Sequence, residues 1–183
     1  SAASAYVVTE GKTDWKHLKA ALRNLHSNGL FPDLQIEFME YEDDPQMGKD
    51  ELFACCTRWA QSPSGLSGLT ICVWDNDDQK MTEKITDQDT YYKAWGKNVY
   101  SFAIPVPAHR QIAGSGSPEI SIELYYQDSD ITRKDQNGRR LYLNTEFDKR
   151  SFRHMKEVDL NCNDSGKIKR NFSCIIDDNV FGT

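Results

Sequence analysis

Short apolar runs at four places in the first 105 residues predict β-strands. Residues 6–9 and 69–74 are rich in β-branched and other apolar side chains, which is typical of strands covered on both faces. Residues 34–40 alternate between apolar and polar side chains, and residues 99–104 form a fourth apolar run. We therefore expect four strands in this part of the chain.

Two segments between these runs have the three- and four-residue apolar spacing of amphipathic helices. The first is expected to begin at Thr13 or Asp14 and to end near Asn28 and Gly29. Its apolar face carries Trp15, Leu18, Leu22 and Leu25. The second runs from about residue 48 to residue 60. This alternation predicts an α/β, Rossmann-like fold, in which helices flank a four-stranded, mainly parallel sheet.

A polar segment with three aromatic residues separates the third and fourth predicted strands. We expect Tyr91, Tyr92 and Trp95 at the end of a helix that packs on the sheet. Stacking of these rings on nucleobases is the alternative.

The last part of the chain is expected to form an extension. We predict an α/β core over residues 1–110 and a C-terminal extension over residues 111–183, packed on that core. The extension would hold a helix from Ser117 that places Glu119 and Glu123 on one face. We expect a basic hairpin over residues 131–143 next, since Asn137-Gly138 favours a tight turn. A last strand is expected over residues 172–176.

Composition narrows the class of protein. The chain has 183 residues, no apolar run long enough to cross a membrane and no visible secretory signal. Its five cysteines form no CxxC pair, which favours reduced thiols and a cytoplasmic location. We therefore expect no membrane partner.

The net charge of −6 is distributed unevenly along the chain. Residues 1–130 carry 11 basic and 20 acidic side chains, whereas residues 131–170 carry 11 basic and 6 acidic ones. An acidic part joined to a basic part suits a metal-dependent enzyme that acts on a polyanion. The alternative is that these charges only solvate the surface.

Carboxylates follow two of the predicted strands. Glu10 comes after the first strand, and Asp75, Asp77 and Asp78 come after the third. Because the carboxyl ends of parallel strands meet at one edge of a sheet, these side chains are expected to share the edge where ligands bind. Carboxylate oxygens are the ligands that Mg²⁺ and Mn²⁺ prefer, so we expect one of these ions as cofactor.

The two segments resemble the motifs of the Toprim domain, which is found in topoisomerases, primases and OLD-family nucleases. The matching residues are Val8-Thr9-Glu10-Gly11-Lys12-Thr13-Asp14 and Ile71-Cys72-Val73-Trp74-Asp75-Asn76-Asp77. The resemblance is strongest to the OLD-family branch. It implies a Mg²⁺- or Mn²⁺-dependent endonuclease domain of a larger OLD-like protein, acting on DNA in preference to RNA, with an ATPase domain or subunit as partner.

The resemblance also implies roles for individual residues. Glu10, Asp75 and Asp77 would bind the metal and carry catalysis, with Glu10 as ligand or as general base. Glu123, and after it Glu119, would help to hold a second ion. Lys167, or in its place Lys169, would be the late catalytic lysine that neutralises charge at the reacting phosphate. The basic residues expected to contact nucleic acid are Lys12, Arg133, Lys134, Arg139, Arg140, Lys149, Arg150 and Lys169.

Two other interpretations stay open. The chain could be a non-catalytic Toprim-like module that binds nucleic acid or protein. It could also be a receiver-like α/β domain, since receivers collect carboxylates at strand ends, although Glu10 stands alone where an acidic pair would be expected.

Overall fold

The computed structural model describes residues 5–41, 47–62, 68–111, 118–134 and 136. The chain divides into two compact units, Ser1–Ile122 and Glu123–Thr183, which are described separately. The division falls twelve residues beyond the boundary predicted from the sequence. The packing of the extension on the core stays a prediction.

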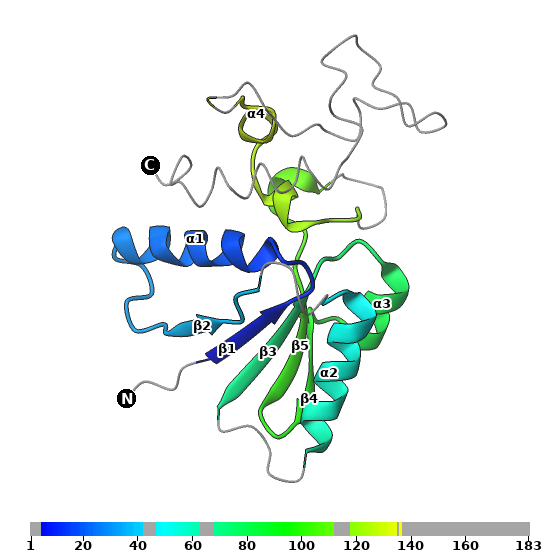
Figure 1. The fold of residues 1–183 in the computed structure, drawn as a ribbon. Coiled ribbons are helices and arrows are strands. Elements are labelled where there is room, and N and C mark those ends of the chain that lie inside the picture. The colour runs from blue at the N-terminus through cyan, green and yellow to red at the C-terminus, as the bar shows by residue number, and fades with distance from the viewer. Residues whose placement is uncertain (1–4, 42–46, 63–67, 112–117, 135, 137–183) are drawn as a thin grey trace. The chain divides into compact units, whose positions relative to one another are not determined.

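The first unit is built on a mixed, five-stranded sheet flanked by helices (Figure 1). Its strand order is β2-β1-β3-β5-β4. The parallel strands are β1 (Ala5–Thr9), β2 (Ile36–Phe38), β3 (Leu69–Trp74) and β5 (Val99–Ala103). The four strands predicted from the sequence are therefore confirmed, and a fifth strand, β4 (Tyr92–Gly96), runs antiparallel to β5.

The strand β4 corrects the prediction for the aromatic segment. Residues 92–96 do not end a helix; they form a hairpin with β5 through the two-residue turn Lys97-Asn98. Both turn residues have positive φ, at 48° and 61°, as a type I′ turn requires. The turn lacks the Asn-Gly or Asp-Gly pair that usually marks such hairpins, which is why the sequence pattern did not predict it.

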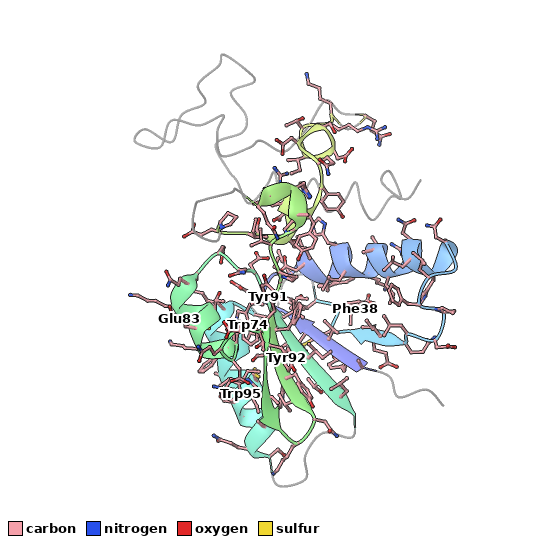
Figure 2. All side chains as sticks on the ribbon, turned by 180° about the vertical axis from the view of Figure 1, so that it is seen from behind. Phe38, Trp74, Glu83, Tyr91, Tyr92 and Trp95 are labelled. Atoms are coloured by element: carbon pink, nitrogen blue, oxygen red, sulfur yellow. The ribbon has the colours of Figure 1, made fainter. Side chains whose placement is uncertain are left out.

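The aromatic residues of this hairpin have different environments (Figure 2). Trp95 packs edge-on against Phe53 of the helix α2 (Lys49–Gln61) with 5.7 Å between ring centroids. Its Nε1 donates to Ser101 Oγ at 2.8 Å. Packing is thus confirmed for Trp95. Tyr91 and Tyr92 are exposed.

Three helices pack on the sheet. The helix α1 (Asp14–Ser27) contacts β1, α2 (Lys49–Gln61) contacts β3, β4 and β5, and α3 (Gln79–Ile85) contacts β5. The predicted ends of α1 are confirmed: Thr13 is its N-cap residue, and Gly29 follows it with a φ of 71°. None of the helices in the described ranges combines the length and the apolar sequence that a bilayer span needs.

The core lies between the sheet and the helices that pack on it. Its fully buried side chains include Val8, Leu52, Ile85 and Val99. Cys56 and Cys72 are also fully buried and carry free thiols. These two cysteines therefore act as small apolar residues of the core.

The predicted helix from Ser117 is wrong. Ile120 instead forms an antiparallel bridge with Asn76, with both backbone N–H groups donating at 2.8 Å. A short 3₁₀ helix over Ile122–Tyr125 follows. Since Ile120 is 1% exposed, pairing with the tip of β3 buries it in a way that a surface helix would not.

The described part of the second unit contains one α-helix, α4 (Asp128–Ile131), so Ile131 does not begin a hairpin strand. The rest of the predicted hairpin, at 135 and 137–143, lies outside the described residues, as does the predicted strand over 172–176. In the first unit, a 3₁₀ turn at Ala108–Arg110 follows β5.

Candidate active site

Glu10 lies at the carboxyl end of β1, in a turn that is fixed on several sides. The backbone N–H of Glu10 donates to Val73 O at 3.0 Å, so the residue stays joined to the neighbouring strand β3. Thr9 is fully buried, and its Oγ1 donates to Gly11 O at 3.0 Å. The Glu10 side chain is consequently presented by an ordered backbone at the junction of β1 and α1.

Asp14 closes this turn from the first residue of α1. Its Oδ2 accepts a hydrogen bond of 2.7 Å from the backbone N–H of Gly11. A Cβ atom on Gly11 would lie 2.6 Å from Asp14 Oδ1, which is closer than real contacts allow. An alanine at position 11 would therefore force the Asp14 carboxylate away from the Gly11 N–H to which it is bonded. In the sequence, Asp14 stands out as a helix start and as part of the first motif, but nothing there indicates this contact.

Tyr41 supports the same turn from the end of β2. Its hydroxyl lies 2.9 Å from Thr9 O and 3.1 Å from Glu10 O, to which it donates. Trp15 Nε1 donates to Tyr41 O at 3.1 Å and holds the tyrosine in place. Burial raises the pKa of Tyr41 to about 12, so the hydroxyl keeps its proton near neutral pH.

The residues after β3 form a second ordered turn beside Glu10. Asp75 Oδ1 accepts from the backbone N–H of Ile122 at 3.0 Å, while the Asp75 backbone N–H donates to the Glu10 carboxylate. Asn76 Oδ1 accepts from Thr82 Oγ1 at 3.1 Å, and Asp78 caps α3 by accepting from Met81 N at 3.2 Å. The tips of β1 and β3 are thereby joined through the side chain of Glu10.

The electrostatics of Glu10 show that carboxylates gather at this edge. Its pKa is raised from 4.5 to about 7, first by burial and then by the nearby charges of Asp77 and Asp14, while the Asp75 N–H and Lys49 act in the opposite direction. We call Glu10, Asp14, Asp75 and Asp77 the acidic cluster. The structure thus brings the three predicted residues Glu10, Asp75 and Asp77 to one edge, and their roles stay predictions.

The donor chemistry of the acidic cluster suits a hard divalent cation, because every group in it offers carboxylate oxygens. In the part of the chain that the structure describes, no three His, Cys, Asp or Glu side chains are placed to hold one ion together. Asp75 Oδ1, for instance, is turned towards the backbone of Ile122. Binding of an ion would therefore need these side chains to turn towards one another.

The other predicted site residues are less closely assembled. Glu119 is exposed and belongs to the first unit, whereas Glu123 is buried and belongs to the second unit. Burial, and after it the charge of Glu123, raises the pKa of Tyr126. They do not share a helix face, because no helix joins them. Lys12 is half-buried in the turn after Gly11, and Arg133 and Lys134 are exposed after α4. The predicted residues outside the described ranges are Arg139, Arg140, Lys149, Arg150, Lys167 and Lys169.

A hollow elsewhere in the first unit is a weaker candidate for the functional site. It measures about 480 Å³, lies between α1 and β2, and is lined by residues that include Tyr6, Arg23 and Phe38. None of the acidic cluster lines it. Its walls carry a mixture of basic, acidic and apolar side chains, so no single chemistry is concentrated there, and the sheet edge remains the candidate site.

Comparisons of the chain with protein-family models, curated proteins and solved structures find no match. The function is therefore inferred from the residues and from their placement.

Proposed function

We propose that the first unit is a Toprim-like nuclease domain that hydrolyses phosphodiester bonds with Mg²⁺ or Mn²⁺, in DNA rather than RNA. The observation that carries the proposal is the acidic cluster at the carboxyl edge of two adjacent parallel strands, where Glu10 and Asp77 interact through their charges. Clustered carboxylates repel one another, and a bound divalent cation removes that repulsion.

Each residue of the cluster has a role in the proposed reaction. Asp75 and Asp77 would be ligands, and Glu10 would be a third ligand or the general base. When bound, Mg²⁺ or Mn²⁺ supplies Lewis-acid polarisation of a phosphoryl oxygen. Glu10 suits transfer of a proton, because its pKa of about 7 lies near the operating pH. Asp14 and Tyr41 act through the backbone of the turn that positions Glu10.

The proposed nuclease domain would act together with an ATPase and with basic residues later in the chain. Resemblance to the OLD-family branch supports an ATPase domain or subunit as partner and a larger protein as context. Basic residues from 131 onward would add contacts to the nucleic acid.

Cleavage assays test the proposal directly. Supercoiled plasmid, single-stranded DNA and RNA are incubated with the protein in Mg²⁺, Mn²⁺ or EDTA, and Glu10→Ala and Asp75→Ala are compared with wild type. We expect metal-dependent cleavage by wild type and a loss of at least about 100-fold in both variants. Glu83→Ala is the matched control, because Glu83 is an exposed carboxylate on the neighbouring helix α3 (Figure 2).

A non-catalytic Toprim-like module is the second candidate, favoured by the finding that no three described ligand side chains already surround one point. This module would bind nucleic acid or protein without cutting it. Wild-type protein that neither cleaves any of the three substrates nor binds Mn²⁺ by calorimetry would replace the nuclease proposal with this one.

A further inference from the structure

Lys49 is a basic residue fixed beside the acidic cluster, and it has no place in the roles assigned so far. It is the first residue of α2, and its carbonyl oxygen accepts a hydrogen bond of 3.1 Å from Trp74 Nε1. Trp74 is almost fully buried and is the last residue of β3, directly before Asp75. The start of α2 is therefore tied to the strand tip that carries the acidic cluster.

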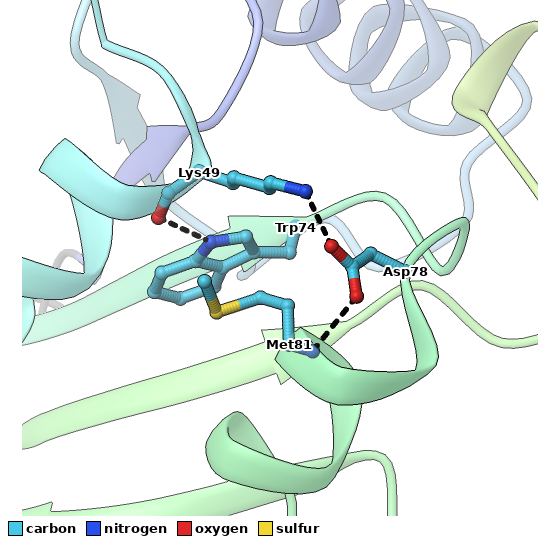
Figure 3. Close-up of polar contacts among 4 residues, drawn as sticks. All are labelled: Lys49, Trp74, Asp78 and Met81. Carbon is cyan, nitrogen blue, oxygen red and sulfur yellow. Dashed lines mark hydrogen bonds and ion pairs between the residues drawn. The ribbon is translucent and has the colours of Figure 1, made fainter.

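The side chain of Lys49 is also held in position (Figure 3). Its Nζ forms an ion pair with Asp78 Oδ2, while Asp78 Oδ1 accepts from Met81 N at 3.2 Å as the cap of α3. Because the helix cap fixes the orientation of Asp78, the carboxylate offers the lysine a defined position. The ammonium is thus anchored between the starts of α2 and α3. Its partner Asp78 directly follows Asp77 of the acidic cluster.

Lys49 is accessible as well as anchored. Its side chain is 44% exposed and that of Asp78 is 30% exposed. An ion pair with this much solvent contact is weak, so an approaching anion can share or replace the carboxylate. The charge of Lys49 also reaches Glu10, whose pKa it lowers.

We infer that the Lys49 ammonium contacts a phosphate oxygen of the nucleic acid at the acidic cluster, with Asp78 as the residue that positions it. The inference rests on the proposed function. A polyanion that approaches four carboxylates needs positive charge near them in addition to the metal, and lysine supplies a compact point charge for phosphate. The role differs from that of Lys167, because Lys49 is supplied by α2 within the first unit.

The test compares Lys49→Ala and Lys49→Arg with the control Lys80→Ala. Lys80 is an exposed lysine of α3 two residues beyond Asp78. In metal-dependent cleavage of a DNA oligonucleotide, we expect kcat/KM to fall about 10- to 100-fold in Lys49→Ala, to recover in part in Lys49→Arg and to stay near wild type in Lys80→Ala.

Binding gives a second measurement that does not depend on cleavage. The affinity of each protein for a fluorescently labelled DNA oligonucleotide is measured in EDTA at several salt concentrations. Loss of one phosphate contact should make the slope of log K against log[salt] shallower by about 0.7 to 0.9 in Lys49→Ala. A purely structural role of Lys49 would leave this slope unchanged, so a wild-type slope in Lys49→Ala would overturn the inference.

Asp78→Asn tests the positioning role. Asparagine also caps helices, so α3 keeps its start while the lysine loses its charged partner. We expect kcat to fall and KM to stay the same or to decrease, because the freed ammonium still attracts phosphate but no longer holds it in place. An unchanged kcat would exclude Asp78 as a positioning residue.

The two proposals fail in different ways. If wild type does not cleave, the nuclease proposal fails, and the salt slope alone then decides whether Lys49 contacts phosphate. If wild type cleaves and Lys49→Ala equals Lys80→Ala in both kcat/KM and salt slope, only the Lys49 inference fails.

Discussion

The ionisation of Glu10 links the candidate site to the stability of the fold. The pKa of Glu10 is 4.5 in its ordinary state and about 7 in the folded protein, chiefly because of burial. Between these two pH values the unfolded chain releases the Glu10 proton while the folded protein keeps it. The free energy of unfolding therefore falls as the pH rises from 4.5 to 7, and the loss is complete above pH 7.

We predict that Glu10→Gln stabilises the protein at pH 8 and changes little at pH 4. Glutamine cannot ionise, so it avoids a cost of about 1 to 2 kcal/mol, a figure reduced from the full shift because Glu10 is only partly buried. Thermal unfolding at both pH values measures the difference. Glu83→Gln, on the exposed face of α3, should show no such dependence. Equal stabilisation by Glu10→Gln at pH 4 and pH 8 would contradict the raised pKa.

Gly11→Ala should destabilise the protein by about 1 to 3 kcal/mol, since the new Cβ would meet the Asp14 carboxylate. Asp14→Ala removes the atoms that clash. In a double-mutant cycle measured by chemical denaturation, Gly11→Ala should therefore cost clearly less in the Asp14→Ala background than in wild type. Additive effects would show that the close approach of Gly11 and Asp14 is not the source of the loss.

Among the elements, the hairpin of β4 and β5 depends most on local backbone geometry. Asn98 has a φ of 61°, which asparagine tolerates and a β-branched residue does not. We predict that Asn98→Val lowers the free energy of unfolding by about 1 to 2 kcal/mol, whereas Asn98→Gly leaves it equal or slightly higher. Urea denaturation of the two variants distinguishes them. A Val variant as stable as the Gly variant would argue against the type I′ turn.

Sequence patterns predicted the elements whose signals are local. The N-cap Thr13, the stop at Gly29 and the whole extent of β3 depend on a few adjacent residues. The strand β4 was missed because its turn uses Lys97-Asn98. The helix expected after Ser117 was wrong because Ile120 pairs with Asn76, forty-four residues earlier, and no local pattern records such a partner.

The candidate site likewise has some features that the sequence predicts and others that it does not. The shared edge of Glu10, Asp75 and Asp77 could be predicted, because parallel strands carry their carboxyl ends to one side. Tyr41 and Lys49 could not, since their contacts with Thr9 and Asp78 join residues about thirty positions apart. The close approach of Asp14 to Gly11 is local in sequence, but it becomes apparent only once the turn has its shape.

At the scale of the whole molecule, charge separates the two units. The first carries 11 basic and 17 acidic side chains, a net charge of −6, whereas the second carries 11 of each. A negatively charged unit repels nucleic acid unless cations intervene. Under the proposed function, divalent ions should therefore strengthen substrate binding in addition to supporting the reaction.

We predict that Mg²⁺ or Mn²⁺ raises the melting temperature of the wild-type protein at pH 8, because an ion that binds only the folded state stabilises it by mass action. An increase of about 5 to 11 °C is expected at an ion concentration 100 times the dissociation constant. EDTA should abolish the increase, and Asp77→Asn should reduce it strongly. The same increase in Asp77→Asn and wild type would place the ion elsewhere.

The two fully buried thiols of the core can report how often the core opens. Cys56 of α2 and Cys72 of β3 touch each other through their thiols, and this contact together with burial raises the pKa of Cys72. A thiol reagent can modify either one only after the helix has separated from the sheet. The rate at which peptide mass spectrometry finds these two positions alkylated, under native conditions, thus measures how often the layers of the first unit come apart.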